Sequence, residues 1–273
     1  MSSATLVDDS AAAPPRTTSQ SGFVVSARIL LAVACVLVGF RAAALLSALP
    51  TEHSPRVSAY FTDAERYHHI AAHSGVPYAD FEVEYPPVTL AFIEVVAQGD
   101  VRSTLRGVGL ASFVLDLLTL GAVAYGFGRR AGLAYLVLST PLFLLPFVYF
   151  RVDFLVVALT AWGLALVKRK FDASGGALLA LAVFAKLWPL TVVPLVLVQR
   201  RPRAIVSVVA CGAVGALGWL LVGGTAGFQQ VLTFRGAKGF QIESVVGGMT
   251  RLFTGETPRS ESGALRVGDM PFA

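Results

Sequence analysis

Long apolar runs, separated by short polar and basic segments, dominate this sequence from residue 26 onward. Several of these runs approach the ~20 residues that a helix needs to cross the hydrocarbon core of a bilayer. Glycine and β-branched residues are frequent but do not alternate with a period of two, so the pattern does not favour a transmembrane β-barrel. The pattern therefore predicts an all-α fold, a polytopic transmembrane helix bundle within residues 23–222.

The individual runs predict where the chain crosses or enters the membrane. Residues 26–49 form the first predicted span and residues 204–222 the last clear one. Residues 175–198 are interrupted by Lys186-Leu-Trp-Pro189, and proline breaks a helix, so we predict a re-entrant pair of half-helices hinged at Trp188-Pro189. Irregular backbone at this depth must be buried in protein or line a cavity, so a cavity is expected near Lys186. The remaining apolar runs are residues 86–97, 108–127, 131–150 and 154–167.

Three segments outside these runs are polar. Residues 1–22 are rich in Ser, Ala, Thr and Pro without periodicity, which predicts a disordered cytoplasmic tail. The loop of residues 50–85 has helical spacing at its centre, and Thr62-Asp-Ala-Glu65 fits a capping box, so we expect an interfacial helix that starts there and lies on the membrane. Residues 223–273 predict a polar segment or tail with no further span.

Composition and charge support a membrane protein and suggest its orientation. Hydrophobic residues make up 55% of the chain and charged residues only 14%, with a mean hydropathy of +0.68, whereas a soluble chain carries about a quarter charged residues. The net charge of +5 comes mainly from basic clusters at the ends of apolar runs, without the basic stripe of a nucleic-acid-binding protein. The positive-inside rule places these clusters in the cytoplasm of a multi-pass plasma-membrane protein. The N-terminus is then cytoplasmic, and loop 50–85, the Arg151/Asp153 corner and residues 223–260 are extracytoplasmic.

Several acidic residues on the predicted outer face are candidates for chemistry. Asp63 is either a general base that accepts a proton from a hydroxyl or an acid in the first turn of a helix, favoured by the helix dipole. Glu82 and Glu84 precede Tyr85-Pro-Pro87, and two residues apart in an extended chain they face the same side. They would bind sugar hydroxyls or a cation, or would simply solvate the membrane boundary.

Ionisable residues in or beside the apolar runs are costly, and by default they indicate function. Arg151 and Asp153 are either such a functional pair or a salt bridge that holds a hairpin. Lys186 would offer a cation to a lipid phosphate, or would snorkel to the surface. Asp116 lies midway along an apolar run, and we expect a structural buried pair with Arg41 or Lys186.

Metal, nucleotide and disulfide chemistry have little support in the sequence. His68, His69 and His73 lack an acid in HExxH spacing, so no metal site is predicted. The chain has neither a phosphate-cradling Gly-rich loop ending in Lys-Ser/Thr nor a Gly-x-Ser-x-Gly elbow. The two cysteines fall inside apolar runs and behave as small hydrophobes. No bound cofactor and no nucleic-acid partner is expected.

Taken in order, these pieces resemble the GT-C fold glycosyltransferases that depend on lipid-phosphate sugars, of the family-87 alpha-mannosyltransferase type. The resemblance covers most of residues 55–250. The segments that carry it are Asp63-Ala-Glu-Arg-Tyr67 with Gly75-Val-Pro-Tyr-Ala-Asp-Phe-Glu-Val-Glu-Tyr-Pro-Pro87, Arg151-Val-Asp153, Ala185-Lys-Leu-Trp-Pro189, and Arg235-Gly236 with Gly239-Phe-Gln-Ile-Glu-Ser244.

The resemblance implies a reaction and a role for each of these segments. A polyprenyl-phosphate sugar, mannose by this resemblance, would be the donor, an extracytoplasmic glycolipid or glycan would be the acceptor, and Asp63 would be the catalytic base. Lys186, Arg151 and Arg235 would bind the donor phosphate. Residues that would bind the sugar or acceptor are Glu84, Asp80, Tyr85, Asp153, Gln241 and Glu243.

Two other functions are compatible with parts of the pattern. A broken helix with a basic residue at the break also suits a transporter or flippase of lipid-linked sugars, although no internal repeat relates the two halves of the chain. Members of the resembled family continue for several more spans beyond the Glu243-Ser244 segment. By that comparison we expect the chain to be short at its C-terminus, and an inactive truncated scaffold is the other alternative.

Overall fold

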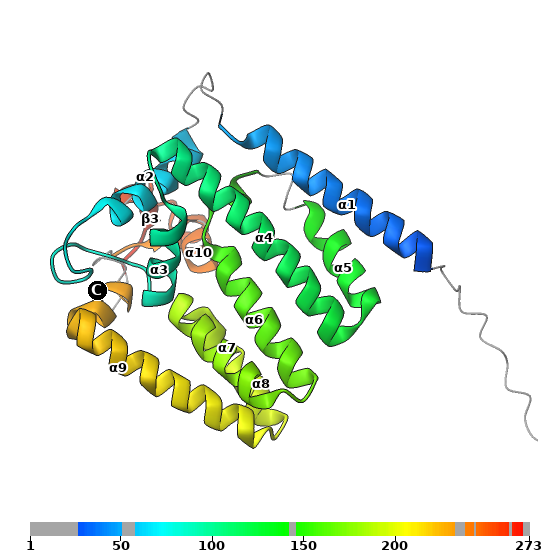
Figure 1. The fold of residues 1–273 in the computed structure, drawn as a ribbon. Helices are drawn as coiled ribbons and strands as arrows, with labels where there is room; N and C mark the ends of the chain where they lie inside the picture. The colour runs from blue at the N-terminus through cyan, green and yellow to red at the C-terminus, as the bar shows by residue number, and fades with distance from the viewer. Residues whose placement is uncertain are drawn as a thin grey trace, which may run out of the picture.

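The structure is a computed structural model that describes residues 27–50, 58–141, 146–232, 238–242, 244–261 and 264–269. Long helices lie side by side and form a bundle, with shorter helices at one end of it (Figure 1). The elements in chain order are α1 (Ala27–Ala48), α2 (Ser58–Ala72), α3 (Pro87–Val96), α4 (Val101–Phe127), α5 (Arg129–Ser139), the 3-10 helix η2 (Pro146–Phe150), α6 (Asp153–Lys168), α7 (Asp172–Ala185), the 3-10 helix η3 (Trp188–Thr191), α8 (Val193–Val198), α9 (Pro202–Leu232), β1 (Phe240–Gln241), α10 (Val245–Thr254), β2 (Arg259–Glu261) and β3 (Ala264–Val267).

The described residues contain three helices long and apolar enough to cross a membrane, at Arg28–Ala48, Val101–Phe127 and Pro202–Leu232. They correspond to the predicted spans 26–49, 108–127 and 204–222, although two of them are longer than the apolar pattern indicated. The helix α4 begins at Val101 because the Asp100 side chain caps it, accepting from the Ser103 N–H at 2.8 Å. The helix α9 continues to Leu232 across a kink at Gly224. The all-α membrane fold is confirmed.

Packing between α6, α7 and α9 depends on small residues at the contact. A side chain added at Gly175 would meet the Gly163 carbonyl oxygen at 2.8 Å, and one at Gly176 would meet the Ala204 carbonyl oxygen at 2.4 Å. Glycine therefore lets the three backbones approach closely, as is common where helices pack in membranes.

The segment of residues 172–201 turns back on itself, as the proline at position 189 predicts. Helix α7 ends at Ala185, Lys186 is extended, and η3 and α8 follow. The two ends of the segment come together, because Arg201 Nη1 lies 4.0 Å from Asp172 Oδ1. Both ends therefore lie at one end of the bundle, and the break at Lys186 lies at the other.

The basic clusters also gather at the end where this segment starts. The Arg169 Nε donates to the Tyr125 carbonyl oxygen at 2.7 Å, which joins the end of α6 to the end of α4. The residues Arg129 and Arg130 open α5 just after α4 ends. The bundle thus has one strongly basic end.

The apolar run of residues 131–150 is not a single helix, because α5 ends at Ser139 and η2 starts at Pro146; Pro141 and Pro146 lack the N–H that a continuous helix requires. One predicted helix boundary is wrong. The helix of the first outer loop begins at Ser58, four residues before the capping-box position Thr62. On this helix Ala64 and Tyr67 are buried against protein.

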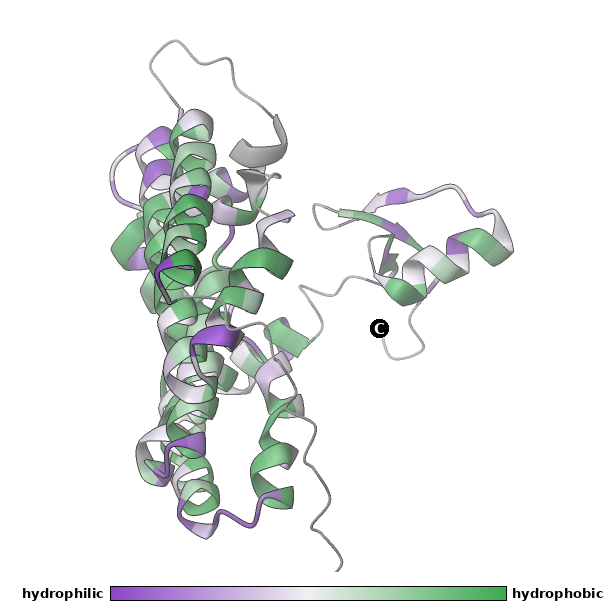
Figure 2. Cartoon of the chain, turned by 90° about the vertical axis from the view of Figure 1, so that its right-hand side faces the viewer, coloured by the Kyte–Doolittle hydropathy of each residue, from purple (hydrophilic) through white to green (hydrophobic). Residues whose placement is uncertain are grey.

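Residues after α9 form more than a polar tail. Helix α10 and the three strands, which pair antiparallel in the order β1-β3-β2, make a small module at residues 238–269. Figure 2 shows this module standing apart from the bundle. The predicted segment 223–273 therefore contains the last turns of α9 and a folded unit that the sequence pattern did not indicate.

Candidate active site

Four charged side chains meet at the end of the bundle opposite the basic clusters. Asp63 comes from α2, Arg151 and Asp153 from the corner where η2 passes into α6, and Lys186 from the break after α7. The Arg151 Nε lies 3.4 Å from Asp63 Oδ2, and Lys186 Nζ donates to Asp153 Oδ1. We call these four residues the charged cluster.

Each member of the charged cluster is held by the element that carries it. The Ser112 hydroxyl of α4 donates to the Arg151 carbonyl oxygen at 3.0 Å, which fixes the corner before α6. Asp153 lies in the first turn of α6, where the helix dipole favours a carboxylate. The Thr89 hydroxyl of α3 donates to the Ala185 carbonyl oxygen at 2.6 Å and so supports the end of α7 just before Lys186.

The charged cluster is open to a ligand. The exposed fractions of its side chains are 37% for Asp63, 54% for Arg151, 42% for Asp153 and 51% for Lys186. Two cations and two carboxylates thus lie beside one another at the surface of one end of the bundle. Such a group is able to hold an anion, bind hydroxyls and accept a proton.

The protonation of Asp63 depends on its neighbours. Partial burial raises the pKa of Asp63 above its ordinary value; the Arg151 cation lowers it, the negative charges of Asp153 and Glu84 raise it, and Lys186 lowers it. The net pKa shift is upward. A carboxylate with a raised pKa is a better proton acceptor than an ordinary aspartate.

Two tyrosines lie behind the charged cluster. Tyr67 is one helical turn after Asp63 on α2, and its ring centroid is 5.9 Å from that of Tyr85. The two rings pack edge-on against each other. Burial raises the pKa of both hydroxyls, so they stay neutral. This ring contact joins the loop that carries Tyr85 to α2 behind the charged cluster.

Glu84 has a strong partner that the sequence did not reveal. Arg66 contacts the Glu84 carboxylate with two nitrogens, Nη2 to Oε2 at 2.6 Å and Nε to Oε1 at 3.2 Å. The Glu84 side chain is only 4% exposed. Glu84 is therefore buried beneath the surface of the loop, where its negative charge raises the pKa of Asp63.

Breaking this pair is expected to loosen the outer loop. The change Arg66→Met removes the two hydrogen bonds that Arg66 donates to the buried Glu84 carboxylate, and it should cost about 1.5–3 kcal/mol of unfolding free energy, the usual contribution of hydrogen bonds to a charged group. Thermal unfolding of the purified protein in detergent measures the effect. Glu82→Gln is the control, because Arg66 contacts only the backbone carbonyl of Glu82. Equal unfolding temperatures for Arg66→Met and wild type would contradict this expectation.

Other predicted site residues lie outside the charged cluster. The Asp80 carboxylate accepts from the Val76 N–H at 2.6 Å and serves the turn of residues 75–81. Gln241 lies on β1 of the module, and its carbonyl accepts from the Ser244 N–H at 3.0 Å. Arg235 and Glu243 lie outside the described residues. Within the part of the chain that the structure describes, no three His, Cys, Asp or Glu side chains are grouped to hold a metal ion.

Comparison with known protein families assigns this architecture. A family model of glycosyltransferase family 87 matches residues 84–265, about two thirds of the chain. The chain belongs to glycosyltransferase family 87. It is therefore a membrane glycosyltransferase, and the matched region of this family-87 member includes Arg151, Asp153 and Lys186, whereas Asp63 lies before it. No curated protein and no solved structure matches the chain.

Proposed function

We propose that this family-87 glycosyltransferase transfers a sugar from a polyprenyl-phosphate donor to a glycolipid or glycan on the outer side of the membrane, and that the sugar is mannose. The observation that carries the proposal is the charged cluster: a carboxylate with a raised pKa beside two cations, half-exposed at the end of a membrane bundle. A lipid-linked donor has its phosphate at the membrane surface. The cluster lies opposite the basic end of the bundle, as an extracytoplasmic site would.

In this proposal Asp63 is the general base. The acceptor oxygen attacks the anomeric carbon of the donor sugar and forms the new glycosidic bond, while its proton passes to the Asp63 carboxylate. The bond between the anomeric carbon and the phosphate oxygen breaks, and its electron pair leaves with the lipid phosphate. Attack and departure on opposite faces invert the anomeric configuration.

The cations Arg151 and Lys186 would stabilise the leaving phosphate. Negative charge grows on the phosphate oxygens as the bond breaks, and fixed cations beside them are worth more in the transition state than in the ground state. Asp153 would keep Lys186 in place and bind sugar hydroxyls, and Tyr85 would support the site from behind. For Arg235, Glu84, Asp80, Gln241 and Glu243, roles in binding donor, sugar or acceptor rest on the resemblance of their segments to the family.

A transfer assay tests the proposed function. Purified protein in lipid is supplied with polyprenyl-phosphate mannose labelled in the sugar and with a glycolipid extract, and labelled product is separated from donor. Transfer that requires both the protein and the lipid-phosphate donor supports the proposal. Transfer from a soluble nucleotide sugar but not from the lipid donor would overturn it.

The pH profile of transfer gives a second prediction. Because the base must be deprotonated, kcat/KM should fall on the acid side as pH drops through the raised pKa of Asp63. Arg151 lowers that pKa, so Arg151→Met should raise it further and move the acid limb to higher pH. Arg151→Lys retains the charge and is the matched control. Its kcat/KM should fall at nearly the same acidic pH as that of wild type. An acid limb that stays in place in Arg151→Met would contradict the assignment of the limb to Asp63.

A further inference from the structure

Helix α10 exposes a continuous apolar face. Its large hydrophobic side chains are between 50% and 80% exposed. They recur with the spacing i, i+1, i+4, i+7 and i+8, so at about 100° per residue they occupy an arc of about 120°. Figure 2 colours much of this helix as hydrophobic. The residues of this face are Val245, Val246, Met249, Leu252 and Phe253.

The opposite side of α10 packs on the strands of its own module. A side chain added at Gly247 would meet the Gln241 carbonyl oxygen at 1.9 Å, so α10 lies directly on β1 at this point. The helix is capped at both ends, by the Ser244 hydroxyl, which accepts from the Gly247 N–H at 3.0 Å, and by Gly255 in the left-handed conformation. The exposed apolar face is therefore a property of a regular, well-anchored helix, and it is separate from the face that the module uses for its own packing.

The module is held close to the membrane by the chain itself. Helix α9, a candidate span, ends at Leu232, and the module begins at Lys238. Six residue steps reach at most about 22 Å when fully extended. The end of α9 is in turn fastened to the outer loop, because Gln230 donates to the Tyr78 carbonyl oxygen at 2.9 Å and accepts from the Val83 N–H at 3.0 Å. The module is thus confined to the end of the bundle that carries the charged cluster.

We propose that α10 is an interfacial helix whose apolar face lies in the headgroup and acyl boundary of the leaflet beside the charged cluster. An amphipathic helix with an apolar arc of this width binds a bilayer surface by burying that face about 5–10 Å deep. Arg251 is exposed in the last turn, but it lies about 100° around the helix from Leu252 and outside the apolar arc, so the inference rests on the apolar side chains and on the short link to α9. Through α10, the membrane surface holds the module over the same leaflet from which a lipid-linked donor would come.

Lipid quenching of single-cysteine probes in the full-length protein tests this inference. Cys35 and Cys211 are both exposed, so Cys35→Ala/Cys211→Ala is the labelling background. A fluorophore is attached through Leu252→Cys or Phe253→Cys, and through Ser260→Cys on the exposed strand β2 as the matched control. In nanodiscs that contain lipid with a quencher near the top of the acyl chain, the probes on α10 should be quenched several-fold more than the probe at position 260.

The apolar face is then disrupted in the same system. Because Leu252 is 77% exposed, Leu252→Asp leaves the packing of α10 on its strands intact. It should reduce lipid quenching of a probe at position 253 to the level of the control. Quenching at positions 252 and 253 no stronger than at position 260 would overturn the inference. The inference would also be overturned if neither the lipid quencher nor aqueous iodide quenched the probes on α10. That result would show that a second copy or another protein covers the face. None of these readouts depends on sugar transfer, so the inference stands or fails separately from the proposed function.

Discussion

Replacing Asp63 by asparagine is expected to lower the rate of sugar transfer by about 100- to 10,000-fold, the usual contribution of a general base. Asparagine has the size of aspartate but does not accept a proton. Asp63 is 37% exposed and forms its ion pair with the exposed Arg151, so the change should leave the folded structure and its thermal unfolding nearly unaffected. The measurement is kcat/KM for labelled-sugar transfer, alongside thermal unfolding of the same preparation.

Two variants make this experiment selective. Glu65→Gln is the same chemical change two residues further along α2, at an exposed side chain, and it should retain wild-type transfer. Asp153→Asn tests the neighbouring carboxylate, which is paired with Lys186 and should affect donor binding more than proton transfer. If Asp153→Asn abolished transfer while Asp63→Asn remained active, the base would be Asp153, and the assignment of Asp63 would be wrong.

The sequence predicted the helical membrane fold because hydropathy reports directly on burial in lipid. It also predicted the break near Lys186, since Pro189 removes a backbone donor at a known place. The same signal is present at Pro141 and Pro146, where the apolar run of residues 131–150 is divided between α5 and η2. The start of α2 was misplaced at Thr62, because a capping-box pattern also occurs inside a helix when the preceding residues are able to extend it.

The candidate site was predicted in part. The sequence indicated Asp63, Arg151, Asp153 and Lys186 as candidates, and the structure brings these four together. It did not indicate that Arg66 binds Glu84, because that pair depends on how the outer loop folds back on α2, and charge alone offered several partners. The module after α9 was missed as well, since strands of two to four residues leave almost no periodic signal.

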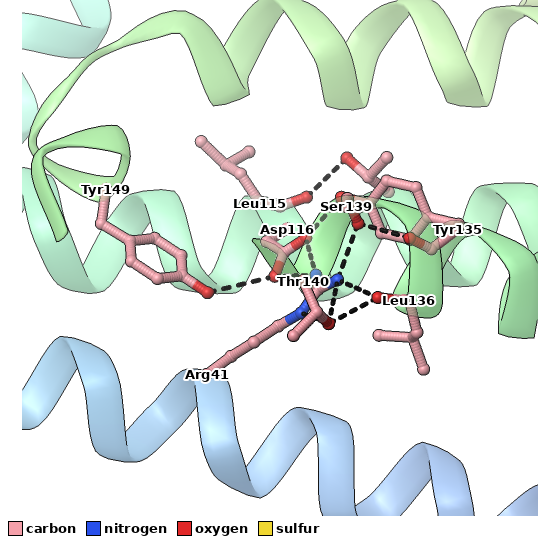
Figure 3. A network of polar contacts seen from close by, with 9 residues as sticks. Arg41, Leu115, Asp116, Tyr135, Leu136, Ser139, Thr140 and Tyr149 are labelled. Carbon is pink, nitrogen blue, oxygen red and sulfur yellow. Dashed lines mark hydrogen bonds and ion pairs between the residues drawn. The ribbon is translucent and has the colours of Figure 1, made fainter. Parts of the chain in front are cut away.

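The sequence also left open which basic residue pairs with the buried Asp116. A structural pair for Asp116 with Arg41 or Lys186 was expected, and the structure selects Arg41. Its Nη1 donates to both Asp116 oxygens, at 2.9 and 2.8 Å, and the two side chains are 0% and 1% exposed (Figure 3). Polar groups of α5 complete the network: the Arg41 Nη2 donates to the Leu136 carbonyl oxygen at 2.9 Å and to the Ser139 hydroxyl at 2.7 Å, and the Tyr135 hydroxyl donates to Asp116.

Removing either partner of this pair is expected to destabilise the protein by about 3–5 kcal/mol, because the other charge is left buried and unpaired. The single variants are Arg41→Met and Asp116→Asn. The double variant removes both charges, so it should be more stable than either single variant. Its loss of unfolding free energy should be much smaller than the sum of the two single losses. Equilibrium unfolding in a denaturing detergent measures all three, with Arg130→Met, an exposed basic residue of α5, as a control that should change stability by less than about 0.5 kcal/mol.

The physical reason for a large effect is the way α1 is attached. Most of its large apolar side chains face outward, with Leu31 and Val36 66% and 69% exposed, whereas Arg41 and Leu45 are buried. Arg41 is therefore the main polar link that joins α1 to α4 and α5, and without it α1 keeps few contacts with the bundle. Cross-linking between cysteines on α1 and α5 should fall in the single variants and recover in part in the double variant. Single variants within about 1 kcal/mol of wild type, well below the cost of an unpaired buried charge, would show that water or lipid headgroups reach this network and that the pair is not the link described here.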